Sequence, residues 1–406
     1  MKKMIKFTCV ILSVLSAGIF TLIGLGKILL PKEITVYSNT ESTVLMGVYE
    51  IESAAPSAVA VSSQESSPQT QCTVTLFGIF PVENITTVES DRKYVYAGGN
   101  AVGIRLYTDG LLVVGLDEVI TENGNVSPGS DCGIEVGDVI VAVEGDDTVS
   151  TAEFVKTVNS LSGEPVELTI KRGEEILTLT LTPEYSTSDE KYRCGLWLRD
   201  STAGIGTMTF IDEETGMMAS LGHAICDSDT QAVLEASGGD ILSADISGIT
   251  PGEKGAAGQL IGTFTDNIIG ALCENNEYGV YGLFTGNTED FDLYPVAGQS
   301  EIEAGSAFVL TTVDENGPSF YDIEIEKITY TEETSARNMV IKVTDEDLLN
   351  ATGGIVQGMS GSPIIQNGML VGAVTHVFLN DPSRGYAIFA ETMVNEADQI
   401  YSELQF

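Results

Sequence analysis

A run of twenty residues without a charged side chain, Phe7 to Gly26, lies close to the N-terminus. A run of this length crosses the hydrocarbon core of a membrane only as an α-helix, because every backbone polar group must then be satisfied within the segment. Three lysines precede the run, and two, Lys27 and Lys32, follow it. This asymmetry favours an orientation with the N-terminus inside and the rest of the chain exported.

A cleaved signal peptide is the competing interpretation of residues 1–30. The apolar part of a signal peptide is shorter than this run, and no clear A-x-A cleavage site follows it. Cys9 lies too early in the run to be a lipidation site. We therefore expect residues 1–30 to remain in place as a membrane anchor.

Charge balance and residue counts exclude several classes of function. The 406 residues include 59 acidic and 19 basic side chains, and the net charge of −40 repels the phosphate backbone of nucleic acids. The six cysteines form no C-x-x-C pair, and two histidines are too few for a histidine-rich metal site. We expect no nucleic-acid partner, no metal site and no cofactor. The length suits two or three domains.

Residues 31–94 are expected to form a juxtamembrane region with a flexible linker and one short β segment. Ser53 to Gln71 is rich in Ser, Ala, Gln and Pro, without a lasting apolar period, which is typical of a linker. A protease would cut the chain there. Cys72 to Val88 alternates Val, Ile, Thr and Phe, which predicts the β segment.

Residues 95–183 combine strands, a glycine turn and a helix. Val139 to Val143 is strand-like, and the turn before it, Gly133 to Asp138, has glycines that permit positive φ. Ser150 to Leu161 predicts a helix, because a capping box at its start precedes an apolar face. A hairpin of two apolar strands follows the helix.

This combination resembles a PDZ domain. The G-I-x-x-G-D-x-I turn is a fairly specific feature of that family, and a loop near residue 101 resembles its carboxylate-binding x-Φ-G-Φ motif. In that family, a peptide's C-terminal end adds as a strand between this loop's strand and the helix. The residues implied as the peptide-binding loop are Ala101, Val102, Gly103 and Ile104. A small β domain without a ligand is the alternative interpretation.

Residues 184–406 are rich in glycine, with short Val, Ile and Thr runs and few convincing helices. Many short strands separated by glycine turns predict a β-barrel or sandwich. The length matches that of a two-barrel peptidase. The whole chain is therefore expected to be mostly β, with a transmembrane helix, an α+β PDZ domain and a double-barrel domain.

The sequence Gly358-Met359-Ser360-Gly361-Ser362-Pro363 has the pattern of a nucleophile turn. A serine hydroxyl needs a base to take its proton and donors to hold the oxyanion that forms on attack. Gly361 permits a tight turn that presents the Ser360 hydroxyl. The backbone N–H groups of Gly358 and Ser360 would form the oxyanion hole. A glycine–serine turn without chemistry is common in β proteins and is the alternative.

Two histidines are candidates for the general base. His223 follows a glycine and lies upstream of Ser360, so it is the natural candidate, with a hydrogen-bonded core histidine as the alternative. His376 lies sixteen residues after Ser360 on an apparent strand. We expect His376 in the core or behind the site.

The C-terminal half resembles the SpoIVB serine peptidases of spore-forming bacteria, which are related to chymotrypsin. The order of anchor, linker, PDZ domain and peptidase is also that of the family. The matching motifs are Gly195 to Thr207, Gly222 to Ile225, Thr352 to Pro363, Gln366 to Gly368 and Ala373 to Pro382.

The resemblance implies a catalytic triad of His223, Asp345 and Ser360. Asp345 precedes Ser360 by only fifteen residues, so Asp347 and Asp266 remain alternatives for the carboxylate that orients the histidine. The family further implies self-cleavage and then cleavage of a membrane-bound regulator of an intramembrane metalloprotease. That cut activates a late sigma factor, and the catalytic domain lies between the forespore and mother-cell membranes.

Other functions fit less well. HtrA-type enzymes place the protease before the PDZ domain, and C-terminal processing proteases need a Ser/Lys pair that is not apparent here. A non-catalytic, membrane-anchored PDZ scaffold with a degenerate peptidase fold is the alternative from a different class.

Overall fold

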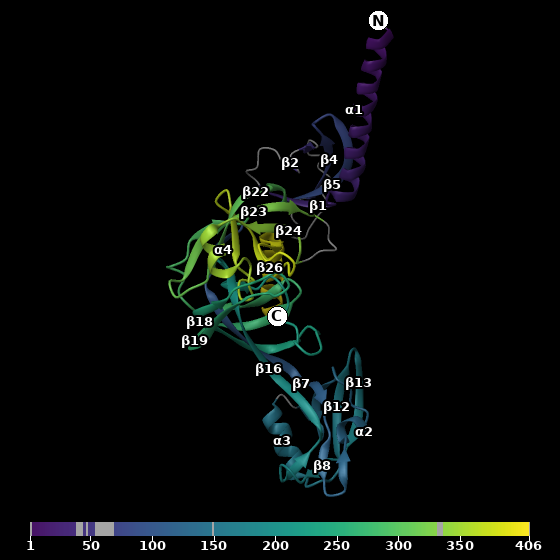
Figure 1. Cartoon of the computed structure of the whole chain (residues 1–406), viewed down its shortest axis with the longest axis vertical. Coiled ribbons are helices and arrows are strands. Elements are labelled where there is room, and N and C mark those ends of the chain that lie inside the picture. Colours follow the sequence, from purple (N-terminus) through teal and green to yellow (C-terminus); the bar gives the residue numbers. More distant parts are fainter. Residues whose placement is uncertain are drawn as a thin grey trace.

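The computed structural model describes residues 2–37, 44–45, 48–52, 69–147, 150–330 and 336–405. The chain is mostly β, with one long apolar helix at its N-terminus, and this confirms the predicted fold class. Figure 1 shows three parts along the longest axis: the helix with a small sheet, a central pair of barrels, and a separate unit beyond them.

Helix α1 (Lys2–Leu29) contains the predicted apolar run. Its segment Val10–Ile28 is long and apolar enough to cross a membrane, and only 6% of it is buried. A signal sequence has the same properties, so length and composition support either an anchor or a signal sequence.

The region after α1 contains more sheet than the sequence predicted. Its five strands are ordered β1-β5-β4-β3-β2. Their bounds are β1 Glu33–Tyr37, β2 Val44–Leu45, β3 Tyr49–Glu52, β4 Gln69–Leu76 and β5 Phe80–Ser90. Most of the predicted linker, residues 53–68, lies outside the described residues, while its last three residues begin β4. The apolar face of this sheet packs against α1 through Ile19, Leu22 and Ile23.

The first barrel closes through six antiparallel pairings in the order β7-β18-β19-β20-β17-β16 and back to β7. Strand β6 (Tyr94–Ala97) pairs outside it, between β16 and β21 (Leu293–Pro295). The strands of the barrel are β7 Ala101–Leu116, β16 Leu196–Asp212, β17 Met217–Ser220, β18 Ala236–Thr250, β19 Gln259–Asn276 and β20 Gly279–Phe284.

The unit that the sequence predicts to be a PDZ domain (the PDZ unit) is an insertion between two strands of this barrel. Strands β7 and β16 run out of the barrel as an antiparallel ribbon, from the pair Ala101–Thr207 to the pair Leu116–Leu196 (Figure 1). The unit therefore includes the end of β7 and the start of β16, whereas the prediction placed it at residues 95–183. Its remaining elements are β8 Val119–Thr121, β9 Gly124–Val126, α2 Pro128–Asp131, β10 Val139–Val143, β11 Asp146–Asp147, α3 Thr151–Ser160, β12 Val166–Arg172, β13 Glu175–Leu181, β14 Glu184–Ser186 and β15 Lys191–Arg193.

Helix α3 forms where predicted, but the free backbone N–H at its start has a different hydrogen-bond partner from the predicted one. Ser150 makes no side-chain capping bond, so the predicted capping box is absent. Instead, the Asp200 carboxylate on β16 accepts a 2.8 Å hydrogen bond from the backbone N–H of Thr151. Phe154 and Val158 are the buried side chains of the helix. The cap thus ties α3 to the ribbon that leads to the first barrel.

The second barrel is closed and has the order β22-β23-β24-β27-β26-β25. The final helix packs Met393 and Val394 in one cluster with Phe210 of the first barrel and Leu370 of the second, so it seals the seam between the barrels. The elements of this part are η1 Gln299–Glu301, β22 Gly305–Thr312, β23 Pro318–Ile328, β24 Met339–Val343, α4 Glu346–Thr352, β25 Pro363–Gln366, β26 Met369–Val377, β27 Arg384–Phe389 and α5 Ala390–Leu404.

Candidate active site

The predicted nucleophile turn lies between α4 and β25, where the two barrels meet. Gly361 has φ +93°, and a Cβ there would lie 2.1 Å from the Thr207 carbonyl and 2.4 Å from the Leu221 amide nitrogen. Only glycine permits this contact, because the clash would be with backbone of the first barrel. Gly361 therefore allows the nucleophile turn of one barrel to lie against the other.

Thr207 on β16 holds the nucleophile turn through hydrogen bonds to two carbonyl groups of that turn. Its backbone N–H donates a 2.9 Å bond to the Ser360 carbonyl, and its Oγ1 donates a 2.7 Å bond to the Gly358 carbonyl. Among the described residues, the N–H groups of Gly358 and Ser360 have no acceptor. Unpaired backbone donors at such a turn suit an oxyanion.

The Ser360 hydroxyl lies at the same cavity as both histidines. Its Oγ donates a 2.8 Å hydrogen bond to the carbonyl of Thr375, at the end of β26. A rotation about χ1 would move this hydroxyl away from the carbonyl. Catalytic hydrogen bonds are often made only once substrate is bound, so this resting position is compatible with a nucleophile.

His223 is placed by a tight turn directly after β17. Leu221 and Gly222 both have positive φ, +68° and +67°, which is unusual for a leucine. The His223 Nδ1 lies 2.9 Å from the carbonyl oxygen of Ala224. Because a carbonyl only accepts, this bond fixes the proton on Nδ1 and leaves Nε2 unprotonated. That is the tautomer a general base requires.

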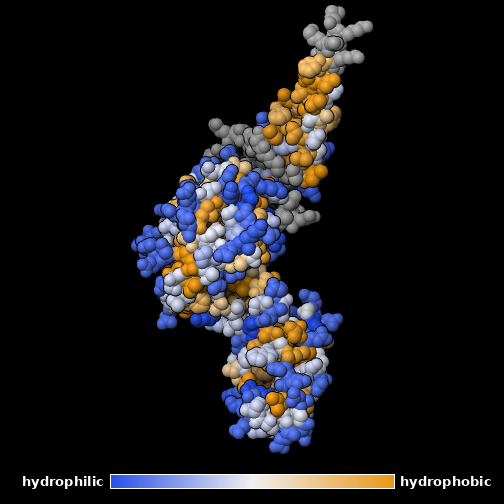
Figure 2. Space-filling model, viewed as in Figure 1, coloured by the Kyte–Doolittle hydropathy of each residue, from blue (hydrophilic) through white to orange (hydrophobic). Residues whose placement is uncertain are grey.

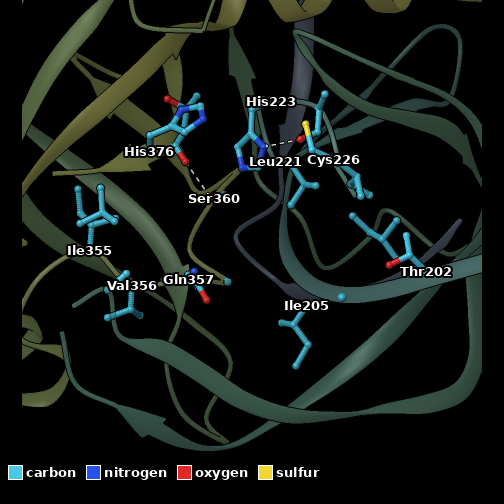
Figure 3. A pocket seen from close by; sticks show the side chains of 18 of the residues that line it. Thr202, Ile205, Leu221, His223, Cys226, Ile355, Val356, Gln357, Ser360 and His376 are labelled. Carbon is cyan, nitrogen blue, oxygen red and sulfur yellow. Dashed lines mark hydrogen bonds between the residues drawn. The ribbon is translucent and has the colours of Figure 1, made fainter. Parts of the chain in front are cut away.

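His376 lies beside His223 and lines the same cavity, whereas the sequence predicted it in the core or behind the site. The ring centroids are 4.8 Å apart and the planes are tilted by 40°. Figure 3 shows the two rings next to one another, with Ser360 at the same end of the cavity. The His376 Nδ1 is buried and has no hydrogen-bond partner among the described residues. The sequence did contain a signal for this position of His376: the chain has only two histidines, and one of them follows soon after the nucleophile.

Burial favours the neutral form of both imidazoles. Desolvation lowers the pKa of His223, and the Ala224 carbonyl opposes this only in part. Desolvation, with the positive charges of His223 and Arg337 when these are present, lowers the pKa of His376 to about 4. Both side chains are therefore uncharged at neutral pH, as a base that must accept a proton has to be.

The cavity around these residues has a volume of about 550 Å³. Its walls come from both barrels and are mostly apolar; examples are Ile205, Ile225, Val356 and Leu379. No acidic or basic side chain other than the two histidines lines it in the described structure. Such a cavity suits an apolar substrate side chain next to the Ser360 hydroxyl.

Asp345 is not in this cavity, contrary to the triad that the family resemblance implied. It is the N-cap of α4, and its Oδ1 accepts a 2.9 Å bond from the Leu348 N–H. Its Oδ2 accepts a longer bond, 3.3 Å, from the Asp322 N–H. The alternatives, Asp347 and Asp266, do not line the cavity either. The prediction that one of these carboxylates lies behind His223 is wrong in this structure.

The predicted peptide-binding loop is also in the wrong place. Ala101, Val102, Gly103 and Ile104 lie within the first barrel, where β16 occupies one edge of their strand. Strand β18 takes the other edge of the last three residues. No strand edge is left there for a peptide. Ile104 lines the active-site cavity instead.

A groove suited to a peptide lies between α3 and the start of β16. It is lined by Phe154, Val155 and Val158 of the helix and by Leu196 and Leu198 of the strand. The residues leading into that strand read Arg193-Cys194-Gly195-Leu196, which also fits x-Φ-G-Φ. Gly195 has φ +65°. The same pattern occurs earlier in the chain, at Val102-Gly103-Ile104, and this explains the wrong prediction.

Comparison with known proteins identifies the family. The model of the SpoIVB peptidase S55 family matches residues 190–394, just over half of the chain. The chain belongs to this family. The matched region contains His223, Ser360 and His376, together with most of both barrels.

Other similarities are shorter. Two proteins of Xylella fastidiosa, from strains Temecula1 and 9a5c and described as "Putative zinc metalloprotease", are 32% identical over 108 residues, or 26% of this chain and 22% of theirs. A protein of Clostridium perfringens with the same description is 37% identical over 70 residues, covering 17% of this chain and 21% of its own length. This chain thus spans about a fifth of the curated relatives it matches. A crystal structure of the PDZ domain of an SdrC-like protein from Listeria monocytogenes is 22% identical and covers 23% of this chain and 90% of its own, with a TM-score of 0.19.

Proposed function

We propose that this SpoIVB-family peptidase is a serine endopeptidase in which Ser360 is the nucleophile and His223 the general base. The observation that carries the proposal is that both residues line one cavity, on turns contributed by different barrels. The two unpaired N–H groups of Gly358 and Ser360 supply the oxyanion hole. All three requirements of acyl transfer by a serine are then met at one place.

In the reaction, His223 Nε2 takes the proton of the Ser360 hydroxyl while Oγ attacks the scissile carbonyl carbon. The carbonyl oxygen becomes an oxyanion held by the two backbone donors. The imidazolium then gives its proton to the leaving amine, and the C–N bond breaks. A water molecule, deprotonated by His223, then attacks the carbonyl carbon of the acyl-enzyme. The ester C–O bond breaks, and His223 returns the proton to Ser360 Oγ, so the free enzyme is restored.

The orienting role that an aspartate has in many serine peptidases falls here to the Ala224 carbonyl. Its bond to Nδ1 holds the His223 tautomer throughout the cycle. His376, which is neutral at neutral pH, packs against the His223 ring. We assign His376 as a positioning residue that fixes the plane of the base.

The PDZ groove and the active-site cavity share one strand. The groove is lined by Leu196 and Leu198 of β16, and the cavity by Thr202 and Ile205 of the same strand. A peptide bound beside β16 would therefore contact the strand that also lines the catalytic cavity. This arrangement supports the PDZ domain as the control element of the peptidase.

We place the enzyme at a membrane, exported and anchored by α1, in the space between forespore and mother-cell membranes. The substrates proposed are the chain itself and a membrane-bound regulator of an intramembrane metalloprotease, whose cleavage leads to activation of a late sigma factor. The family assignment and the apolar helix support this setting.

Labelling with a fluorophosphonate tests the activity. Wild-type protein is expected to be labelled and to cleave itself, whereas Ser360→Ala abolishes both and leaves the circular dichroism spectrum unchanged. The matched control is Ser362→Ala, two residues along the same turn, which keeps the nucleophile. Absence of labelling in folded wild-type protein would favour the scaffold. Loss of proteolysis in a chelator, with labelling intact, would point to metal-dependent chemistry instead.

A further inference from the structure

Three large apolar side chains are exposed together at the tip of the β4–β5 hairpin, outside the peptidase and the PDZ unit. Phe77 is 49% exposed, Ile79 71% and Phe80 37%. Turn residues are ordinarily polar or glycine, because they face water. An apolar cluster at a turn therefore indicates a surface that is covered in the functional state.

The backbone conformation at Phe77, in the tip, is unfavourable for a bulky side chain. Phe77 and Gly78 both have positive φ, +54° and +65°, and the Ile79 N–H donates a 3.2 Å bond to the Leu76 carbonyl. The first position of such a turn is normally Asn, Asp or Gly, because bulky side chains are strained there. A phenylalanine in this conformation is a strained residue of the kind found at functional sites.

The hairpin lies beside the helix that is long enough to cross a membrane. In the parallel pairing of β1 and β5, Glu33 lies opposite Thr86. Strand β5 begins six residues earlier, at Phe80, which extends it about 20 Å back along α1 at 3.3 Å per residue. Figure 1 shows the small sheet alongside the C-terminal part of α1.

Direct contacts fix this overlap. A Cβ on Gly26 would lie 2.7 Å from Val82, so glycine permits a close approach of helix and hairpin. The Tyr49 hydroxyl donates a 2.7 Å bond to the Leu22 carbonyl. Both contacts lie within the apolar segment Val10–Ile28. The tip precedes Val82 in the hairpin and so lies farther back along α1, level with that segment. Figure 2 shows how apolar the surface of α1 is there.

We propose that the Phe77–Phe80 tip inserts into the lipid of the membrane that holds α1, as a second contact of the exported domain with the bilayer. No charged side chain occurs from Phe77 to Val82. The Glu50 carboxylate, which reaches the Gly78 turn, limits the depth to the boundary between head groups and acyl chains. The inference rests on the proposed retention of α1 as an anchor. Two contacts would fix the height and the rotation of the peptidase above the membrane.

Depth-dependent fluorescence quenching tests this with the full-length chain in vesicles of phosphatidylcholine and phosphatidylglycerol. The reporter is Ile79→Trp in a Trp197→Phe background, because Trp197 is the single native tryptophan. Lipids brominated near the head-group end of the acyl chain are expected to quench this reporter at least about twofold more than lipids brominated near the methyl end. Wild-type Trp197, 62% exposed in the PDZ unit, is the control that stays unquenched.

A second reporter separates failure of the tip from failure of the anchor. Phe20→Trp, also with Trp197→Phe, reports on α1 itself, where Phe20 is 74% exposed. Quenching at position 20 without quenching at position 79 overturns the proposal while the anchor stands. Quenching at neither position overturns both. A further outcome is that the tryptophan at position 79 is unquenched by lipid and becomes less accessible to water as the protein density in the vesicles rises. That result would show that a second copy of the chain covers the tip, and it would also overturn the proposal.

Relief of the turn strain provides an independent variant. Phe77→Asn places a favoured residue at the first turn position and removes one apolar ring. It is expected to raise the thermal midpoint and to weaken lipid quenching of the Ile79→Trp reporter. A lower midpoint together with unchanged quenching would show that Phe77 is structural and makes no lipid contact.

Discussion

The Asp345 carboxylate caps helix α4 by accepting a 2.9 Å hydrogen bond from the Leu348 N–H. The bond gives Asp345 a structural role, whereas the family resemblance assigned this residue to the catalytic triad. An N-cap satisfies a backbone donor at the first turn of a helix, and serine does this as well as aspartate.

We predict that Asp345→Ser retains the rate of self-cleavage within about threefold. Asp345→Ala, which cannot cap, should lower the free energy of unfolding by about 1 kcal/mol and still be labelled by a fluorophosphonate when folded. A catalytic aspartate would instead cost about four orders of magnitude in rate on substitution. Rates of cleavage and urea unfolding curves check both, with Asp347→Ser as the neighbouring control. A large loss of rate in a stable Asp345→Ser protein would contradict the assignment.

His376→Gln is predicted to lower kcat by about ten- to a hundredfold with little change in KM. Glutamine fills part of the volume but provides no ring to pack against His223, so the base is less well fixed while the substrate cavity is largely kept. The wild-type rate should fall with acid only below the ordinary histidine pKa of about 6.5, because burial lowers the pKa of His223. A kcat–pH profile measured for both proteins tests this. An unchanged kcat in His376→Gln would show that the second histidine only fills space.

The pKa of His376, about 4, also predicts how stability depends on pH. A histidine with a lowered pKa binds a proton more readily when unfolded, so its contribution is fully present above about pH 6.5 and is lost as the pH falls toward about 4. In His376→Phe this loss should be smaller, since phenylalanine does not titrate. Urea midpoints across this pH range, compared between the two proteins, give the difference. Parallel pH dependences would contradict a lowered pKa at His376.

The elements read most reliably from the sequence were those with local signals. The Ser360 turn, helix α3 and the apolar α1 each follow from spacing within about twenty residues. The hydrogen-bond partner of His223 could not be predicted from the sequence, because it is a backbone carbonyl and any residue type provides one. Asp345 lies near Ser360 in the chain, but in the structure it caps a helix. The pairing of β7 with β16 joins Val102, Gly103 and Ile104 to residues 100 to 104 positions later in the chain. These three residues therefore matched a loop motif although both edges of their strand are occupied.

The contact of Gly361 with the first barrel gives the sharpest test of how the site is assembled. Gly361→Ala places a Cβ within 2.4 Å of the Thr207 carbonyl and the Leu221 nitrogen, in backbone that cannot rotate away. We expect it to abolish fluorophosphonate labelling, because the Ser360 turn and the His223 turn are forced apart. Gly368→Ala is the matched control: it too has positive φ, +77°, but nothing lies within 4 Å of its Cβ, so it should cost only about 1 kcal/mol of backbone strain and keep labelling. Thermal melts alongside labelling distinguish the two effects. A folded Gly361→Ala protein that is labelled at the wild-type rate would mean that the two turns are not held together by this contact.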